Sequence, residues 1–97
     1  MAYKYRLSSS AERELEWEIS YSAERWGKKH ARLYRQGLLA VIKYIAANPN
    51  AYPERPELGE NYRLVRYKGN YIIYSVNKEE GYIDIIAFPS VYRSSKN

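Results

Sequence analysis

The chain of 97 residues lacks cysteine and contains a single histidine. Without cysteine it has no disulfide, thiol nucleophile, zinc ribbon or iron–sulfur cluster, a composition that a reducing compartment tolerates. His30 and the only aspartate, Asp84, leave little for a catalytic triad, and no spacing of histidine and carboxylates resembles a set of metal ligands. We therefore expect no catalytic triad, no metal and no cofactor.

Long apolar runs and glycine clusters are also missing. No stretch approaches the ~20 apolar residues that cross a bilayer, and residues 1–6 lack the apolar run of a signal peptide. The five glycines are scattered singly, so there is no glycine-rich phosphate loop. These absences predict a cytoplasmic protein without a membrane segment and give no support to nucleotide binding.

Basic and aromatic residues are abundant. The formal net charge is +5, and the chain contains twelve tyrosines and two tryptophans. Glutamates crowd one helical segment and basic residues the next, which is typical of solvated helix faces. Tyrosines and basic residues are concentrated in the C-terminal half, where Arg63, Arg66 and Lys68 lie along a strand-like segment. Such groups stack on bases, contact phosphates or anchor a protein interface.

The length and the continuous pattern of periodic segments predict one domain over residues 1–97. Alternation over 3–7 predicts a strand. Ser9 and Glu12 form a capping-box pattern, so a helix is expected to begin near Ser10 and to end at Gly27. One stripe of this helix is expected to face the core. It consists of Ala11, Leu15, Ile19, Ser22 and Trp26.

A second amphipathic pattern predicts a helix that stops by Ala47, because Asn48 precedes Pro49. Residues 48–61 contain three prolines and a glycine, too many breakers for regular structure. Three strands then follow at 62–67, 71–76 and 82–88, separated by glycine-containing turns. The predicted fold is α+β, with an N-terminal strand and a helical hairpin packed on one face of a four-stranded, mainly antiparallel sheet.

Some side chains of the helical region stand out. Trp17 and Tyr21 lie four residues apart but roughly 200° around the helix from Leu15 and Ile19, at 100° per residue. They are expected either to cover the sheet edge or to await a partner. The glutamates of this helix are expected to face water, and His30 is expected at the surface. Tyr5 and Tyr74 are predicted to be core residues.

Four segments carry a resemblance to a known family. They are Tyr5-Arg6-Leu7-Ser8, Tyr21-Ser22-Ala23-Glu24-Arg25-Trp26-Gly27, Ile45-Ala46-Ala47-Asn48-Pro49 and Tyr71-Ile72-Ile73-Tyr74-Ser75-Val76. In order and spacing they resemble the ParE branch of the ParE/RelE toxin superfamily, and the similarity spans essentially the whole chain. The resemblance implies a RelE/ParE-like fold and a type II toxin that a cognate antitoxin neutralises.

The resemblance also implies two alternative activities. ParE-type members poison DNA gyrase without being enzymes, whereas RelE-type members cleave messenger RNA on the ribosome. Cleavage would need a base, and no residue here is a convincing one. The favoured hypothesis is therefore a non-enzymatic gyrase poison, and the alternative is a ribosome-dependent mRNA endonuclease using Arg66, Lys68, Tyr92 and Arg93.

Two positions depart from the family pattern. Glu18 stands where an apolar residue is usual, so the first helix is expected to be rotated or repacked there. The chain ends Ile86-Ala87-Phe88-Pro89-Ser90-Val91-Tyr92-Arg93 where the ParE pattern has an Arg-Val-Leu-His-like string. This difference leaves open another target, or a toxin-like fold that has lost toxicity.

These considerations define two sets of candidate residues and no catalytic residue. Trp17 and Tyr21 are expected to contact the antitoxin, together with a free sheet edge. A third class of function, a single-strand nucleic-acid module, rests only on the tyrosine and arginine content. The basic strand face and the tail are expected to bind the target through Arg63, Arg66, Lys68, Tyr71, Tyr92 and Arg93.

Overall fold

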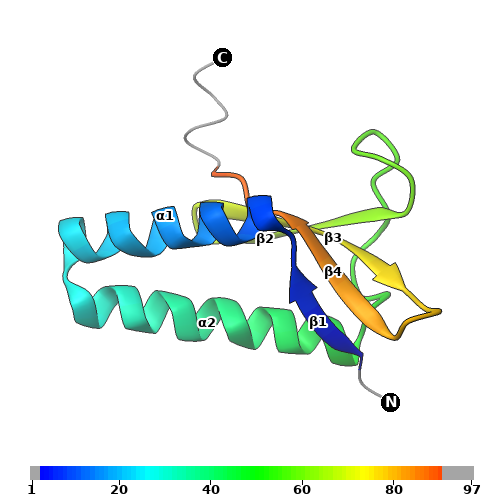
Figure 1. Ribbon diagram of the computed structural model, residues 1–97, viewed down its shortest axis with the longest axis horizontal. Coiled ribbons are helices and arrows are strands. Elements are labelled where there is room, and N and C mark those ends of the chain that lie inside the picture. The colour runs from blue at the N-terminus through cyan, green and yellow to red at the C-terminus, as the bar shows by residue number, and fades with distance from the viewer. Residues whose placement is uncertain (1–2, 91–97) are drawn as a thin grey trace.

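The computed structural model describes residues 3–90 and contains two helices and four strands in that range (Figure 1). The predicted α+β fold is confirmed, and the three C-terminal strands start and stop within two residues of the expected positions. The elements are β1 (Lys4–Leu7), α1 (Ser9–Trp26), α2 (Lys28–Ala47), β2 (Tyr62–Tyr67), β3 (Asn70–Asn77) and β4 (Tyr82–Ala87).

The four strands form one sheet in the order β1-β4-β3-β2. β2, β3 and β4 make two antiparallel hairpin pairs, whereas β1 pairs in parallel with β4, with Tyr5 opposite Ile83. Parallel neighbours need a long crossover, and the two helices with strands β2 and β3 provide it. The sheet is therefore mainly antiparallel, as predicted, and its edge strands are β1 and β2.

Ser8 sets the start of α1. Its hydroxyl accepts a hydrogen bond from the Ala11 amide at 3.0 Å and donates one to the Ile86 carbonyl at 2.8 Å. The predicted cap at Ser9 is thus wrong by one residue, because Ser8 has the extended backbone that an N-cap requires and Ser9 is already helical. The same hydroxyl also ties the helix start to the residues of β4.

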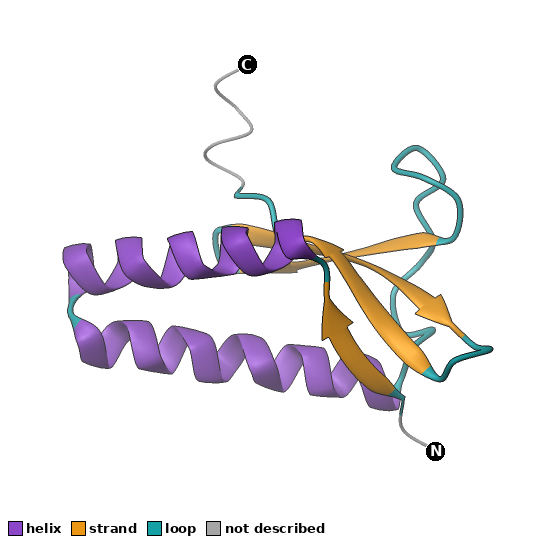
Figure 2. Cartoon of the chain, in the orientation of Figure 1, coloured by secondary structure: helices purple, strands orange, loops and turns teal. Residues whose placement is uncertain are grey.

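Gly27 alone joins the two helices, which lie side by side as the predicted hairpin (Figure 2). Its φ of 99° lies in a region that glycine tolerates because it has no Cβ. Its amide donates to the Ala23 carbonyl at 3.0 Å and so satisfies the end of α1. The hairpin ends at Asn48, whose amide bonds back to the last turn of α2.

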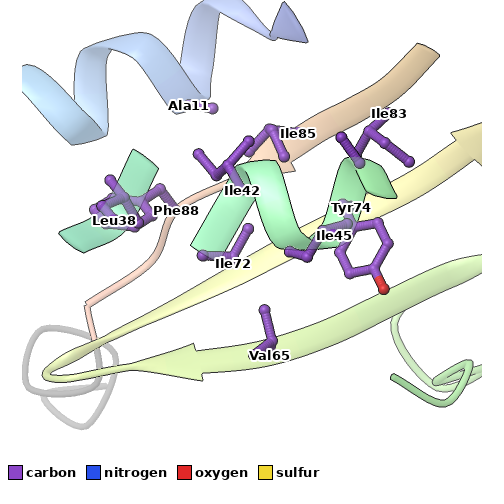
Figure 3. Close-up of a cluster of buried hydrophobic side chains, with 11 residues drawn as sticks. Ala11, Leu38, Ile42, Ile45, Val65, Ile72, Tyr74, Ile83, Ile85 and Phe88 are labelled. Atoms are coloured by element: carbon purple, nitrogen blue, oxygen red, sulfur yellow. The ribbon is translucent and has the colours of Figure 1, made fainter. Parts of the chain in front are cut away.

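The core lies between α2 and the inner face of the sheet (Figure 3). Leu38, Ile42 and Ile45 point from α2 toward side chains of β3 and β4, and each is almost completely buried. Burying one such side chain contributes roughly 1.5–3 kcal/mol. The sheet side of this core contains Val65, Ile72, Tyr74, Ile83 and Ile85, with Phe88 directly after β4.

The stripe predicted for α1 is only partly correct. Ala11 and Ser22 are buried and Leu15 packs against the core, but Trp26 is 60% exposed. The helical hairpin projects past the end of the sheet, so the last turn of α1 has no strand beneath it (Figure 1). Tyr74 is fully buried as expected, whereas Tyr5 is only partly buried on the edge strand.

Residues 48–61 contain no helix and no extended strand, as their prolines predicted. Side chains of the sheet hold this loop in place, because the Tyr74 hydroxyl donates to the Pro49 carbonyl at 3.1 Å and Arg63 donates to the Tyr52 carbonyl. Within residues 3–90, neither helix is sufficiently long and apolar to cross a bilayer.

The buried Tyr74 hydroxyl should make stability depend on alkaline pH. Burial raises its pKa from 10.0 to about 12, so the folded protein holds the proton more tightly than the unfolded chain does. This contribution is complete below pH 10 and is lost as the pH rises toward 12. Urea denaturation should therefore show a steeper loss of unfolding free energy over this window in the wild type than in Tyr74→Phe.

The Tyr74→Phe comparison has an internal control. At pH 7 the variant should be less stable by about 1 kcal/mol, the usual net value of one lost hydrogen bond. Between pH 7 and 9 the two proteins should keep a constant difference. If the unfolding free energies of the two proteins stay a constant distance apart above pH 10, the pH dependence does not come from the Tyr74 hydroxyl.

Candidate functional site

Alternation along β2 places its two arginines on opposite faces of the sheet. Arg63 and Val65 point toward the helices, whereas Arg66 points away from them, since successive side chains of a strand alternate. The expectation that Arg63 and Arg66 share one basic face is therefore wrong. The sequence already contained this information, because two strand residues that are an odd number of positions apart, here three, lie on opposite faces of the sheet.

Arg63 is engaged inside the structure. Its side chain is only 15% exposed, and its guanidinium donates to the Tyr52 carbonyl and pairs with Glu54 at 3.3 Å. An isolated bridge between Glu54 and Arg63 joins the same loop to β2. Arg63 thus fixes the 48–61 loop rather than presenting its charge to solvent.

Arg66, Lys68 and Tyr71 come together at the turn between β2 and β3, and we call these three residues the basic turn. The Arg66 Nε donates to the Lys68 carbonyl at 3.0 Å, and its guanidinium lies 6.0 Å from the ring centroid of Tyr71, its partner across the strands. Lys68 has a φ of 53° and keeps its side chain exposed. Two solvent-facing cations beside a ring can bind carboxylates or phosphates.

Tyr92 and Arg93 lie outside the described residues. The described chain nevertheless ends beside the basic turn, because the Tyr71 amide donates to the Pro89 carbonyl at 2.9 Å and Asn70 forms a bridge with Ser90. The structure therefore brings the start of the C-terminal segment to the same end of the sheet as Arg66 and Lys68.

The face of the sheet away from the helices is mixed in character. Leu64, Ile73 and Ala87 pair across three strands to form an apolar row. On β1, Arg6 forms ion pairs with Asp84 and with Glu80, and it lies over the Tyr82 ring at 4.2 Å. Asp84, the only aspartate, is thus paired with an arginine 78 residues away, and no local sequence pattern predicts this ion pair.

A groove lies between the projecting end of the helical hairpin and the turn between β2 and β3, with a volume of about 720 Å³. Trp17 and Tyr21 stack within it, with ring centroids 5.1 Å apart and planes 8° apart. They are 44% and 43% exposed, so the second of the two expectations, rings left open to a partner, agrees with their exposure. We call it the aromatic groove; its main lining residues are Trp17, Tyr21, Trp26, His30, Tyr34 and Lys68.

The aromatic groove combines apolar area with a mainly positive rim. Arg25 and Lys68 flank the rings, and Glu18 contributes the opposing charge. Ser22 at its base is buried, and its hydroxyl has no hydrogen-bond partner among the described residues. Glu18, which departs from the family pattern, sits in an uninterrupted α1, so the helix is not broken there.

The titratable side chains near the groove offer little for acid–base chemistry. Burial and the nearby Glu18 raise the pKa of Tyr34 well above its usual range, and burial also raises the pKa of Tyr67. Both phenols therefore stay protonated at neutral pH. His30 is exposed at the surface, as expected, and lies 6.0 Å from the Trp26 ring, and residues 3–90 contain no group of three or more side chains suited to a metal ion.

Two polar residues that the sequence did not single out organise the end of the described chain. Glu14 was expected to face water, but its carboxylate accepts a hydrogen bond from the Phe88 amide at 2.7 Å. Asn70 is only 2% exposed and accepts a hydrogen bond from the Tyr34 hydroxyl. No local pattern marks them, because Phe88 is 74 residues from Glu14 and Tyr34 is 36 residues from Asn70 in the chain.

Comparison with solved structures defines the class of protein. The chain is similar to the chromosomal ParDE toxin–antitoxin system of P. aeruginosa, with a TM-score of 0.76, 15% identity, and coverage of 93% of this chain and 97% of that chain. It is also similar to a mutant of the E. coli toxin RelE in the free state, with a TM-score of 0.61, 15% identity, and coverage of 98% and 90%. The fold is thus that of the ParE and RelE toxins.

Sequence comparison then identifies the family. The model for the ParE toxin of the type II toxin–antitoxin system parDE matches residues 5–90. Toxin ParE1 of Mycobacterium tuberculosis is 33% identical over 88 residues, which cover 89% of this chain and 87% of that protein. Toxin ParE1 of Caulobacter vibrioides is 33% identical over 72 residues, covering 74% and 75%. The chain belongs to the ParE family of type II toxins, as the resemblance indicated.

The two strand arginines should differ sharply in their effect on stability. Arg63→Ala removes a bond to a loop carbonyl and an ion pair at a partly buried site, so it should lower the unfolding free energy by about 1–3 kcal/mol. Arg66→Ala, at an exposed position, should change it by less than about 0.5 kcal/mol. Urea denaturation of both variants measures this, and equal losses would contradict the assignment of the two faces.

Proposed function

We propose that this toxin acts by binding, and that its target is DNA gyrase in the cytoplasm, where a cognate antitoxin neutralises it. The observation that carries this proposal is the match to the ParE family over residues 5–90. Of the two activities that the resemblance implied, gyrase poisoning is the one that belongs to ParE-type members. The proposed target surface is the basic turn, Arg66, Lys68 and Tyr71, together with Tyr92 and Arg93 beyond it.

The chemistry of the basic turn supports binding over catalysis. RNA cleavage through a 2′-hydroxyl needs a base to remove its proton and cations to stabilise the charged phosphate. Arg66 and Lys68 supply cations, but the tyrosines packed behind the turn, Tyr34 and Tyr67, hold their protons because burial raises their pKa values. The exposed Arg66 and Lys68 side chains give the turn a positive charge, which suits an acidic protein surface.

A second candidate function is a RelE-like mRNA endonuclease. The exposed cations Arg66 and Lys68 favour it, since a cleaved phosphate needs positive charges to stabilise its transition state. In this case Arg66 and Lys68 would stabilise the transition state, and Tyr92 would be the acid or base.

The antitoxin is proposed to cover the aromatic groove. Stacked, half-exposed rings near a positive rim suit an apolar segment with acidic residues, and aromatic residues are typical anchors of protein interfaces. Solved structures similar to this chain include toxin–antitoxin complexes, among them RelBE2 from Mycobacterium tuberculosis. The edge strands β1 and β2 offer further main-chain contacts by strand addition.

The test of the proposed activity compares two reactions run with the same purified protein. One measures supercoiling and the trapping of cleavage complexes by DNA gyrase, and the other is a coupled translation reaction probed for cuts in the message. Trapped complexes with intact message support the gyrase proposal. Cut message with unaffected gyrase overturns it and makes Arg66, Lys68, Tyr92 and Arg93 catalytic candidates.

Replacing Arg66 and Arg93 together by alanine should abolish toxicity, because two of the three positive charges of the proposed target surface are lost. Antitoxin affinity should not change, since neither residue belongs to the proposed antitoxin site. The measurement is growth after induction without antitoxin, at matched protein levels. Arg32→Ala with Lys43→Ala is the control, since it removes two exposed charges from α2 instead. If the Arg66/Arg93 variant stops growth as completely as the wild type does, these two residues do not form the target surface.

Replacing Trp17 and Tyr21 together by alanine should weaken antitoxin binding by at least 100-fold, because two buried aromatic anchors each contribute about 2 kcal/mol or more. Titration calorimetry with the purified antitoxin measures the change. Leu33→Ala with Tyr44→Ala serves as the matched control, since both side chains are about as exposed but lie on α2 outside the groove. Unchanged affinity of the Trp17/Tyr21 variant would remove the groove from the interface.

A further inference from the structure

The sheet has two edges, and β1 forms one of them (Figure 1). Every second amide of β1 bonds toward β4, since the Lys4 and Ser8 amides donate to carbonyls on that side at 3.0 Å. Because main-chain groups alternate in direction along a strand, those of Tyr5 and Leu7 point away from β4. Within residues 3–90 no segment bonds to them. β1 therefore presents unpaired hydrogen-bonding groups at these two residues.

A groove of about 590 Å³ lies beneath this edge, between β1 and the two helices. Tyr5 and Leu7 face it, since they pair with Ile83 and Ile85, which are buried on the helix side of the sheet. We call it the edge groove; its apolar lining consists of Tyr5, Leu7, Leu15, Ile19, Leu39 and Ile42. Charged side chains complete its lining: Glu12, Glu16 and Arg35. Apart from Ile42, the apolar side chains are only partly buried.

The other edge, on β2, is less suited to an apolar strand. The 48–61 loop covers its first half, because the Arg55 amide donates to the Tyr62 carbonyl at 2.7 Å and an isolated bridge joins the loop to β2. By alternation, the main-chain groups of Leu64 and Arg66 point to the same side as that carbonyl. The hollow beside this loop has a mainly polar lining. An open edge beside an apolar groove is thus a feature of β1 and not of β2.

The charges of β1 argue against a second copy of this chain as the occupant. Two copies related by a two-fold axis would pair antiparallel through the same residues. A register centred on Tyr5 sets Lys4 against Arg6, and one centred on Lys4 or Arg6 sets that residue against its own copy. Like charges directly opposite each other destabilise a strand pair. Charged residues on an edge strand are a common protection against such self-association.

The same charges favour an acidic partner. Lys4 is exposed and forms no ion pair within residues 3–90, whereas Arg6 is already paired with two carboxylates. Both side chains lie on the face away from the helices, because they alternate with Tyr5 and Leu7. A strand added to β1 would place every second side chain beside Lys4 and the others in the edge groove. The groove already has two carboxylates at its rim, so an acidic residue fits only on the Lys4 side.

We propose that the antitoxin adds an extended segment to β1 as a further strand of the sheet. This segment alternates apolar side chains, which fill the edge groove, with polar ones that include a carboxylate beside Lys4. The proposal rests on the proposed function in one respect, that a cognate antitoxin is the partner. Its site is separate from the aromatic groove, because the two grooves share no lining residue.

Amide hydrogen exchange tests which edge the antitoxin uses. The toxin is measured by NMR alone and in complex with its purified cognate antitoxin. We expect the Tyr5 and Leu7 amides to exchange at least about 100-fold more slowly in the complex, because each gains a main-chain acceptor. The Leu64 and Arg66 amides, which face the open side of β2, are the matched control and should change by less than about threefold.

Three results would overturn the proposal. Protection of Leu64 and Arg66 instead would place the added strand on β2. Antitoxin binding without protection at either edge would mean that no strand is added, even if a helix lies in the edge groove. Protection of Tyr5 and Leu7 in the toxin alone, rising with its concentration, would identify a second copy as the occupant.

Charge reversal at Lys4 tests the acidic character of the segment. Lys4→Glu should weaken antitoxin binding at least about tenfold, since attraction becomes repulsion, whereas Lys4→Arg should keep the parental affinity. Lys43→Glu is the control, because this lysine of α2 is also exposed but does not line the edge groove. Equal affinities of the Lys4→Glu and Lys43→Glu proteins would contradict an acidic partner at β1. Thermal melting checks folding, and if Lys4→Glu does not fold, the exchange comparison decides alone.

Failure of the proposed function would look different. A toxin that leaves gyrase and message intact refutes the proposed activity, while the exchange pattern of its antitoxin complex still shows whether β1 gains a strand. Bound antitoxin with unprotected Tyr5 and Leu7 refutes only the added strand. An antitoxin that does not bind at all refutes the neutralisation, and the added strand with it.

Discussion

The structure depends on the burial of one face of α2 against the inner face of the sheet. Leu38, Ile42 and Ile45 contact a layer of isoleucines on β3 and β4, with the Tyr74 ring among them. This contact decides which side of every strand is covered and which is open. It also fixes where the helical hairpin ends relative to the sheet, and therefore which aromatic residues remain exposed.

The two candidate surfaces follow from that constraint. Since β2 must direct Val65 into the core, Arg66 faces away from the helices and Arg63 faces the loop that it holds. Since the hairpin is longer than the sheet beneath it, Trp17, Tyr21 and Trp26 line a groove instead of a core. One packing interaction thus places the basic turn and the aromatic groove at the same end of the molecule, with Lys68 common to both.

Membership of the ParE family over residues 5–90 gives the class of protein, a toxin of a type II toxin–antitoxin system. Two surfaces of different character lie at one end of its fold. The basic turn presents Arg66 and Lys68 to solvent, and the aromatic groove presents the stacked rings of Trp17 and Tyr21. Glu14 and Asn70 hold Phe88 and Pro89, the residues that follow β4, by hydrogen bonds.

Local periodicity, capping and breakers were sufficient to predict the element order and the approximate strand limits. They left open the strand order, and whether Trp17 and Tyr21 cover the sheet edge or stay exposed, because both depend on how the elements pack. The cap at Ser8, the inward turn of Arg63, the exposure of Trp26 and the roles of Glu14 and Asn70 depend on contacts between residues far apart in the chain. Such contacts leave no periodic trace in a single sequence, since they arise when separate elements pack.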